Sequence, residues 1–504
     1  ETLELLGDKV QARALAERCG IPIMSGSLQP VSLEQAREFF STLGDNTSMM
    51  IKAVSGGGGR GMRMVKNIDE LEEAYIRCQS EARAAFGNDA IYVEQFMSPA
   101  RHIEVQIIGD GTGEVVHLYE RECTIQRQNQ KLVEIAPSPG LSTLLREKLL
   151  EDAVCLAREV RYLSLGTFEF LVEAEQDRGD TDRKENSYAF IEANTRLQVE
   201  HTITEEVTGV DLVKIQLQLA AGKTLSELGL NVAKTQKPIG FAMQVRINTE
   251  TMDPDGSVRP SAGGITAFDL PSGRGVRIDT CGYVGYHTSP NFDSLLAKLI
   301  CFSTSPDFSQ TINRTYRALS EFRIEGVQSN IPFLQSLIKH PEFLANRIYT
   351  GFITEHLAEL VKPDNEIHQR LYFDETASQS QSGARVNHAG VKVDAADPLA
   401  VLDYGKSETD VTPVYETIDP QGESRTFDIP EQEGITVIQS FLQGTIVSID
   451  VKVGDLVKKK QQVLVMNAMK MENVIYAPIS GLITQITVSE DDAVYEKQPL
   501  VYMQ

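Results

Sequence analysis

Gly444 to Met466 reads GTIVSIDVKVGDLVKKKQQVLVM, and Gly481 to Met503 reads GLITQITVSEDDAVYEKQPLVYM. The two stretches align without a gap, and apolar residues alternate with polar ones in both. Alternation with a period of two is typical of half-buried strands, and a duplicated set of strands predicts a small all-β sandwich with internal twofold symmetry. A tight hairpin between the halves would expose one side chain, that of Lys470, which stands between Met469 and Met471.

This C-terminal segment resembles the biotinyl domain of biotin-dependent carboxylases, whose lysine carries biotin through an amide bond. Lipoyl domains share the half-repeat but usually have acidic residues and alanine around their lysine, so the two methionines favour biotin. The resemblance implies that Lys470 is the biotinyl-lysine and that a biotin protein ligase is a partner. The alternative is an ordinary exposed lysine on a hairpin. Asn467 stands where the family commonly has glutamate, which would weaken ligase recognition only if the ligase reads that charge.

Length and composition are those of a soluble multidomain protein. The 504 residues predict about three domains, and 24% charged and 41% apolar residues are ordinary values. The net charge of −23 argues against nucleic acid or an anionic membrane as a partner. Six cysteines without a CxxC pair are typical of a reducing compartment. We expect a cytoplasmic protein, or a mitochondrial matrix protein if the source is eukaryotic.

Residues 1 to about 361 alternate helical and strand patterns, as α/β enzymes do. The expected helices are Leu5–Cys19, Ile68–Phe86, Leu144–Tyr162 and Glu205–Ala221, and the expected strands are Met49–Val54, Met62–Val65, Ile103–Gly109 and Glu114–Glu120. Thr376 to Gly383, TASQSQSG, has the composition of a linker. For residues 384 to 434 we expect a few strands docked on a neighbouring domain.

A glycine-rich stretch, Gly56 to Gly61, satisfies the dinucleotide-binding pattern G-x-G-x-x-G. That pattern requires a helix to start at its last glycines, whereas a strand pattern follows here. No Gly-Lys-Ser/Thr closes it, so it is not a Walker loop either. We interpret it as a hairpin loop whose backbone N–H groups can cover phosphates, with Lys52 on the preceding strand supplying positive charge. The alternative is a flexible surface loop.

The stretch Ile191 to His201, IEANTRLQVEH, has a polar side chain at every second position: Glu192, Asn194, Arg196, Gln198 and Glu200. If the chain is extended here, all five point to one side, which is costly in a core unless they bind something. Glu169, in the neighbouring strand pattern TFEF, can converge on the same point. Glu169, Glu192 and Asn194 then form an all-oxygen set of the kind that Mg²⁺ requires beside nucleotide phosphates. The alternative is a solvated strand at a sheet edge.

Together these stretches are similar to the ATP-grasp biotin carboxylase family, from Glu1 to about residue 361. The motifs that carry the resemblance are LLGDK, IKAVSGGGGRGM, RHIEVQI, QRQNQK, TFEF, EANTRLQVEH, QVRIN and NFDSLLAKLI. The resemblance implies an α/β (α+β) ATP-grasp domain followed by an all-β sandwich of the biotinyl/lipoyl type. The expected domains are the ATP-grasp domain in 1–241, a biotin carboxylase C-terminal subdomain in 242–361, a linker with a small β-rich segment in 362–434, and the biotinyl carrier domain in 435–504.

The resemblance also implies roles for individual residues. Mg²⁺ or Mn²⁺ would be held by Glu169, Glu192 and Asn194. ATP would be bound by Lys9, Lys52, Gly57, Gly58, Gly59, Glu94 and His102. Bicarbonate would be bound by Arg196, Gln198 and Val199, with Lys131 near both substrates. Glu200 would be the base for the bicarbonate proton, and Arg246 would offset the negative charge that develops on the ureido oxygen of biotin.

The function that the resemblance implies is ATP- and bicarbonate-dependent carboxylation of biotin on Lys470, a ligase reaction that forms a C–N bond. A carboxyltransferase domain or subunit would then pass CO₂ to an acceptor, within a multifunctional homo-oligomer. The domain order and the segment 397–402, DPLAVL, favour a single-chain acyl-CoA carboxylase of fatty acid metabolism over a pyruvate or urea carboxylase. Two alternatives are a non-catalytic biotin carrier and a carboxylate–amine ligase. Lys470 argues against the second, because such ligases do not use biotin.

Two features depart from the family pattern. Family members begin with a further N-terminal subdomain that helps to wall the active site, and this chain starts inside the pattern, so we expect its catalytic competence to depend on that subdomain. Asn129 stands where the family commonly has histidine. No carboxyltransferase sequence is present either.

Overall fold

The computed structural model describes residues 2–44, 47–55, 61–127, 129–174, 188–230, 237–288, 293–361, 370–371, 435–441, 444–468, 471–494 and 498–504. Several predicted features lie outside these residues: the glycines Gly57, Gly58 and Gly59, the linker at 376–383, the segment 384–434 and Lys470 itself. The described part of the chain contains no helix long and apolar enough to cross a membrane.

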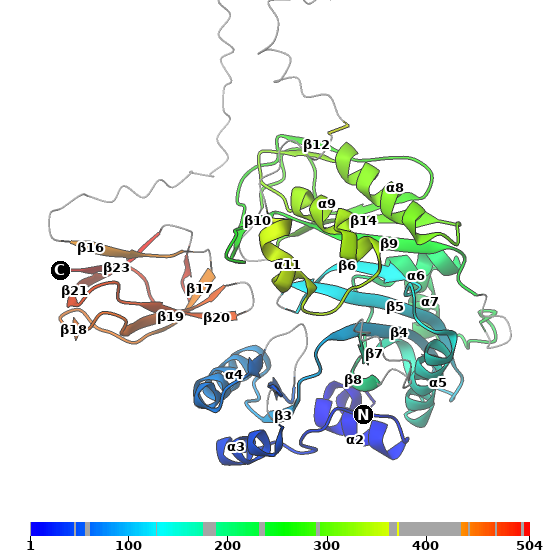
Figure 1. Ribbon diagram of the computed structural model, residues 1–504, viewed down its shortest axis with the longest axis horizontal. Coiled ribbons are helices and arrows are strands. Elements are labelled where there is room, and N and C mark those ends of the chain that lie inside the picture. Colours follow the sequence, from blue (N-terminus) through cyan, green and yellow to red (C-terminus); the bar gives the residue numbers. More distant parts are fainter. Residues whose placement is uncertain are drawn as a thin grey trace, which may run out of the picture.

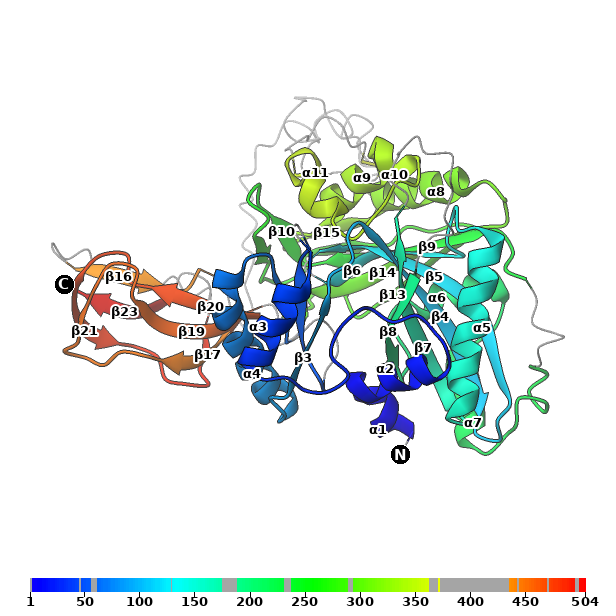
Figure 2. The ribbon, with the colours of Figure 1, turned by 60° about the horizontal axis from the view of Figure 1, so that its bottom comes forward.

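The chain begins with two short helices, α1 (Thr2–Gly7) and α2 (Lys9–Arg18), where we expected one. The break is at Asp8, whose backbone is extended and whose carboxylate accepts hydrogen bonds from the backbone N–H groups of Val10 and Gln11. An aspartate in this position caps a new helix instead of continuing the previous one. Figure 2 shows both helices beside β7 and β8, the strands that carry the predicted metal ligands.

A small subdomain follows, in which a three-stranded antiparallel sheet of order β2-β1-β3 packs on two helices (Figure 2). Its elements are α3 (Leu33–Thr42), β1 (Met49–Ala53), β2 (Met62–Val65), η1 (Ile68–Glu70), α4 (Leu71–Phe86) and β3 (Ile91–Gln95). Met49 and Ile51 of β1 are buried in the core, and Lys52, the residue after Ile51, therefore points to the opposite face of the sheet. The strands expected on either side of the glycine-rich loop are confirmed, and Lys52 pairs with Met62.

The centre of the molecule is an eight-stranded antiparallel sheet of order β13-β14-β9-β6-β5-β4-β7-β8 (Figure 1). Its strands are β4 (Ala100–Asp110), β5 (Val115–Arg127), β6 (Gln130–Ala136), β7 (Leu163–Glu173), β8 (Tyr188–Asn194), β9 (Phe241–Asn248), β13 (Val276–Thr280) and β14 (Leu295–Ser303). The hairpin expected around Asp110 and Gly111 is confirmed as β4–β5. Because β9 pairs with β6, one continuous sheet joins the segments on both sides of residue 241.

Helices cover both faces of this sheet. They are α5 (Thr143–Glu159), α6 (His201–Thr208), α7 (Leu212–Ala220), α8 (Phe308–Glu321), α9 (Ile331–Lys339), α10 (Pro341–Leu344) and α11 (Phe352–Leu360). On β9, Ala242 packs with α6 while Met243 packs with α8 and α9, so these helices lie on opposite faces. The single helix expected at Glu205–Ala221 is wrong: α6 ends at Gly209, which has φ +71°, and Asp211 caps α7.

Short strand pairs complete the region between the sheet and its helices. They are β10 (Glu250–Met252) with β11 (Val258–Pro260), and β12 (Ala267–Asp269) with β15 (Arg323–Glu325).

The C-terminal domain is the predicted sandwich of two sheets, β16-β23-β21-β18 and β20-β19-β17-β22. Its strands are β16 (Thr436–Gln439), β17 (Gly444–Ile449), β18 (Leu456–Val457), β19 (Gln462–Ala468), β20 (Met471–Tyr476), β21 (Gly481–Ile486), β22 (Ala493–Val494) and β23 (Pro499–Met503). Strands at equivalent places in the two half-repeats occupy equivalent places in the two sheets, which confirms the internal symmetry. Ala468 of β19 pairs with Met471 of β20, so the half-repeats join at the tip of a hairpin.

Candidate active site

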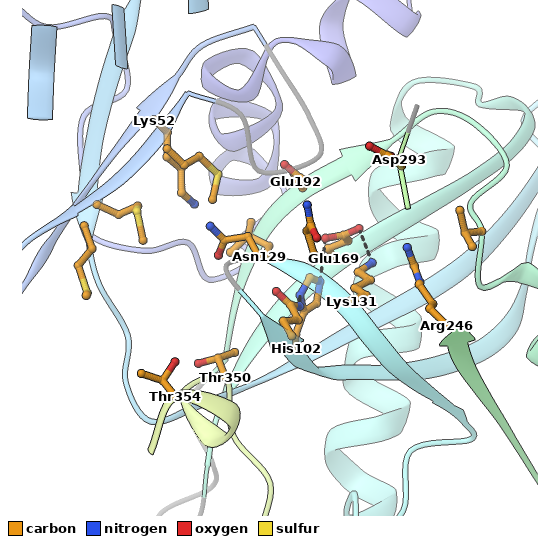
Figure 3. A pocket seen from close by; sticks show the side chains of 18 of the residues that line it. Lys52, His102, Asn129, Lys131, Glu169, Glu192, Arg246, Asp293, Thr350 and Thr354 are labelled. Carbon is orange, nitrogen blue, oxygen red and sulfur yellow. Dashed lines mark hydrogen bonds and ion pairs between the residues drawn. The ribbon is translucent and has the colours of Figure 1, made fainter. Parts of the chain in front are cut away.

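A cavity of about 1330 Å³ lies between the small subdomain and the face of the large sheet. Figure 3 shows Lys52 on the small sheet, across the cavity from Lys131, Glu169 and Glu192 on the large one. Every predicted site residue that the structure describes lines this cavity: Lys9, Lys52, Glu94, His102, Lys131, Glu169, Glu192, Asn194, Arg196, Gln198, Val199, Glu200 and Arg246. The structure therefore brings together residues from the whole length of the first 250 positions.

The predicted metal ligands meet at the edge of the large sheet. Glu169 of β7 and Glu192 of β8 are directly paired in the ladder. Asn194 Nδ2 lies 2.8 Å from Glu169 Oε1 and 3.0 Å from Glu192 Oε1. If the amide is turned over, its Oδ1 joins the two carboxylates and the set becomes all-oxygen. The residues present therefore match what Mg²⁺ or Mn²⁺ requires.

The expectation that the strand continues to Glu200 is wrong, because β8 ends at Asn194. The next residues form a turn that leads into α6, and Glu200 is the residue before its first turn. Gln198 fixes this turn through its Nε2, which donates to Glu169 Oε1 at 2.9 Å. Alternating polar residues are compatible with a strand and also with a turn whose side chains converge on one site. In this chain α6 begins at His201, so the preceding residues form a turn.

Glu200 is buried and lies between two cations. Lys131 Nζ is 2.6 Å from its Oε1, and an Arg246 guanidinium nitrogen is 3.2 Å from its Oε2. Burial alone would raise the pKa of Glu200, but the charges of Lys131 and Arg246 outweigh it and hold the pKa well below the ordinary value. The carboxylate is thus ionised. Arg196, which lies four residues before Glu200 in the chain, is exposed and donates instead to the carbonyl of Leu197.

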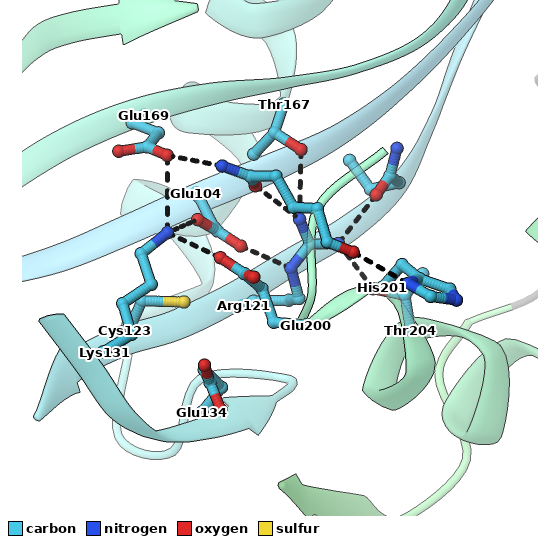
Figure 4. A network of polar contacts seen from close by, with 12 residues as sticks. Glu104, Arg121, Cys123, Lys131, Glu134, Thr167, Glu169, Glu200, His201 and Thr204 are labelled. Carbon is cyan, nitrogen blue, oxygen red and sulfur yellow. Dashed lines mark hydrogen bonds and ion pairs between the residues drawn. The ribbon is translucent and has the colours of Figure 1, made fainter. Parts of the chain in front are cut away.

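Lys131 connects the metal ligands to Glu200. Its Nζ lies 2.5 Å from Glu104, 2.6 Å from Glu200 and 3.4 Å from Glu169 (Figure 4). Burial would lower the pKa of Lys131, but these three carboxylates raise it well above the ordinary value. Lys131 is therefore a fixed positive charge in the floor of the cavity.

Sequence reasoning missed two residues under this floor, Glu104 and Arg121. The Arg121 side chain is fully buried, and its Nε donates to Glu104 Oε1 at 2.5 Å. Its remaining donors reach Gln106, Thr204, Thr167 and Gln198 (Figure 4). A signal was present, because Glu104 and Gln106 alternate with buried apolar residues in RHIEVQI and so had to find partners inside.

The two lysines predicted to bind ATP, Lys9 and Lys52, each form an ion pair with a carboxylate. Lys9 Nζ is 2.6 Å from Glu192 Oε2, and Lys52 forms an ion pair with Glu94. Burial would lower the pKa of Lys9, and Glu192 raises it above the ordinary value. His102, the other described residue predicted to bind ATP, has its Nε2 at 2.7 Å from Glu169 Oε2.

Asn129 lies at the tip of the β5–β6 hairpin and lines the same cavity (Figure 3). Its φ of +64° is left-handed, a conformation that asparagine adopts more readily than most residues do.

Comparison with known proteins agrees with this geometry. Three family models match: "Carbamoyl-phosphate synthase L chain, ATP binding domain" over residues 8–228, "Biotin carboxylase C-terminal domain" over 244–355 and "Biotin-requiring enzyme" over 436–503. The pyruvate carboxylase of Aspergillus niger is 44% identical over 405 residues, which are 79% of this chain and 33% of that protein. The mitochondrial pyruvate carboxylase of Mus musculus is 45% identical over 377 residues, 74% of this chain and 31% of that protein.

Two solved structures are informative. The biotin carboxylase domain dimer of Hydrogenobacter thermophilus 2-oxoglutarate carboxylase, in complex with MgADP, ADP and bicarbonate, has a TM-score of 0.64 and 37% identity. The similarity covers 71% of this chain and 75% of that chain. A single-chain, multi-domain long-chain acyl-CoA carboxylase has a TM-score of 0.59 and 30% identity, over 100% of this chain and 40% of that chain.

The fold is thus an ATP-grasp carboxylase fold followed by a β-rich biotinyl domain, as predicted. The chain belongs to the biotin carboxylase family of biotin-dependent carboxylases. It spans about one third of the length of the curated relatives that it matches.

Proposed function

We propose that this chain carboxylates biotin attached to Lys470, with MgATP and bicarbonate as substrates, as the first half-reaction of a biotin-dependent carboxylase. One observation carries the proposal: Lys131 Nζ lies within 3.4 Å of a metal-type carboxylate, Glu169, and of an ionised carboxylate at the turn into α6, Glu200. A metal ligand and a base linked through one cation are what a reaction between a nucleotide phosphate and bicarbonate requires.

The metal site would consist of Glu169, Glu192 and the Oδ1 of Asn194. When bound, Mg²⁺ or Mn²⁺ neutralises phosphate charge and orients the terminal phosphate for attack. Occupation of this site also changes the partners of the lysines. Lys9 pairs with Glu192, and with a cation bound at that carboxylate Lys9 would be available to a phosphate. The pair of Lys131 and Glu169 would change in the same way, so both lysines would offset part of the negative charge of the substrates.

Glu200 would take the proton of bicarbonate. A bicarbonate oxygen attacks the γ-phosphorus, the bond to ADP breaks, and the proton moves to a Glu200 oxygen, which leaves carboxyphosphate. In the structure two cations hold the Glu200 carboxylate and make it a weak base. Anionic substrates would draw part of the Lys131 charge to themselves, which raises the proton affinity of Glu200 when it is needed.

The carrier side of the reaction involves Arg246 and the C-terminal domain. Biotin would supply the ureido nitrogen that accepts the carboxyl group of carboxyphosphate, with inorganic phosphate as the leaving group and as the acceptor of the ureido proton. Arg246 would supply positive charge beside the ureido oxygen. Gly444, Thr445 and Asn467 of the biotinyl domain line the same cavity, next to the hairpin that bears Lys470. The proposal includes a biotin protein ligase that loads Lys470.

For the final acceptor we propose an acyl-CoA, because similarity to the long-chain acyl-CoA carboxylase extends over 100% of this chain. Pyruvate is the second candidate, because the curated relatives with 44% and 45% identity are pyruvate carboxylases. Either acceptor requires a carboxyltransferase domain or subunit, and we propose a homo-oligomer in the cytoplasm or the mitochondrial matrix. Fixation of labelled bicarbonate by the full-length protein, with acyl-CoA or pyruvate in parallel reactions, distinguishes the two acceptors.

The first half-reaction is tested without any acceptor. ADP release by the full-length protein should depend on bicarbonate, on Mg²⁺ and on biotin. The label from bicarbonate should appear on the protein and be lost when Lys470 is replaced by arginine. ATP hydrolysis that does not depend on bicarbonate would refute the proposal, and a complete absence of ADP release would refute it in favour of the non-catalytic carrier.

A further inference from the structure

The turn between β8 and α6 has to hold its shape without a strand ladder. Two consecutive carbonyl oxygens of this turn accept hydrogen bonds from side chains. The oxygen of Gln198 lies 2.7 Å from Nδ1 of His201 and 3.3 Å from its backbone N. The oxygen of Val199 accepts from Lys298 Nζ at 3.1 Å. The peptide planes on both sides of Val199 are therefore held by side chains.

Lys298 reaches this turn from β14, the strand next to the edge strand β13 of the large sheet. It lies on β14, directly paired with Arg246 of β9 and with Asp279 of β13. Directly paired residues point to the same face of a sheet. Lys298 and Arg246 therefore stand side by side, one bonded to the backbone oxygen of Val199 and the other to the Glu200 carboxylate. Val199 is thus held through its backbone oxygen, and Glu200 is held through its side chain.

Lys298 is itself firmly oriented. Its side chain is 13% exposed, and its Nζ is 3.2 Å from Asp279 Oδ2. Asp279 is fixed by Arg277, whose Nε and Nη2 donate to its two oxygens at 2.9 and 3.1 Å. Burial would raise the pKa of Asp279, but Arg277 and Lys298 together lower it, so the aspartate is ionised. Lys298 thus has an anion on one side and the carbonyl of Val199 on the other.

We propose that Lys298 is a positioning residue for the carboxylation of biotin. By holding the carbonyl of Val199 it fixes the rotation of the peptide plane between Val199 and Glu200, and this rotation sets where the Glu200 carboxylate stands relative to bicarbonate. The inference rests on the proposed function, in which Glu200 is the base. Lys298 is not among the described residues that line the cavity, and its contacts are with the oxygen of Val199 and with Asp279, so its effect should be confined to steps that involve bicarbonate.

The test is Lys298→Met in the full-length protein, with bicarbonate-dependent ADP release as the assay. Methionine keeps the apolar stem but cannot donate to Val199, and Asp279 keeps both bonds to Arg277. Methionine removes a hydrogen bond from a charged donor to this carbonyl, and from the usual strength of such a bond we expect kcat/KM for bicarbonate to fall roughly 10- to 100-fold. The KM for ATP should change by less than about twofold, because ground-state binding of the nucleotide is untouched.

Two further variants separate positioning from general damage. Lys298→Arg can donate to the same carbonyl and should recover most of the activity. Lys339→Met is the matched control: Lys339 on α9 also donates to an amide oxygen, that of Asn313, at 3.1 Å, but Asn313, unlike Val199, does not line the cavity. It should leave all kinetic constants unchanged.

The outcomes are distinguishable. If the unaltered protein shows no bicarbonate-dependent ADP release, the proposed function fails before Lys298 is tested. If the unaltered protein is active and Lys298→Met keeps its kcat/KM for bicarbonate, the positioning role is refuted. Equal losses for ATP and bicarbonate, together with a lower melting temperature, would also refute it. If Lys298→Met does not fold, Asp279→Asn loosens the same lysine and should lower kcat/KM for bicarbonate several-fold, and an unchanged value there would overturn the inference.

Discussion

Glu200→Gln removes the carboxylate that we propose accepts the bicarbonate proton but keeps the size and hydrogen-bonding capacity of the side chain. The amide weakens two contacts, with Lys131 at 2.6 Å and with Arg246 at 3.2 Å. Each cation keeps another carboxylate, because Lys131 still has Glu104 at 2.5 Å and Arg246 still has Glu134 at 2.5 Å. No buried cation is left unpaired, so we expect the fold and ATP binding to survive.

The expected size of the effect follows from the role of the base. Loss of a general base lowers the rate by roughly 10² to 10⁴, which corresponds to about 3 to 5 kcal/mol in the barrier. The substitution also makes the cavity one charge more positive, and a positive cavity attracts bicarbonate. The KM for bicarbonate should therefore stay constant or fall while kcat drops. A lower kcat without a higher KM indicates that the lost interaction acts in the transition state.

The assay is bicarbonate-dependent ADP release, titrated with bicarbonate at saturating MgATP, beside a direct measurement of ATP affinity. Glu134→Gln is the matched control. Glu134 pairs with the same Arg246, at 2.5 Å, but does not line the cavity, so it cannot accept the bicarbonate proton and its replacement should cost about tenfold or less. If Glu200→Gln binds ATP normally and turns over at nearly the unaltered rate, the base lies elsewhere and the reading of this turn is wrong.

Three more predictions concern the carrier, the core and acid stability. Lys470→Arg should give no signal on an avidin blot, and a remaining signal would place the biotin elsewhere. Phe170→Ala, at a fully buried position, should lower the free energy of unfolding by about 3 to 5 kcal/mol in urea titration, and a loss below about 1 kcal/mol would contradict the described core. Cations lower the pKa values of Glu169, Glu192 and Glu200 against the effect of burial. Their stabilising contribution is therefore complete above the ordinary value of about 4.3 and is lost as pH falls below it. The melting temperature should drop on acidification, less steeply in Glu200→Gln, and an identical slope in both would refute this assignment.

Sequence reasoning succeeded where a structure depends on neighbours in the chain. The half-repeats predicted the two equivalent sheets of the C-terminal domain, because strand alternation is a property of adjacent residues. Two strand patterns likewise predicted that Glu169 and Glu192 can converge on one point, and the ladder pairs them directly. The same reasoning failed at Asp8, which separates two helices because its carboxylate accepts hydrogen bonds from backbone N–H groups. It also failed after Asn194, where the strand ends and Gln198 bonds to the distant Glu169.

The sequence by itself predicted the fold class and the site residues that the structure brings together around one cavity, and it supports the proposal that Lys470 is the carrier lysine. Only the tertiary structure decided which charges meet there. Glu200 depends on Lys131 and Arg246, which are 69 and 46 residues away in the chain. Arg121 reaches Gln198 across 77 positions. These contacts follow from the strand order β9-β6-β5-β4-β7-β8. Local periodicity carries no information on that order, because it shows which face of a strand is buried but not which strand lies beside it.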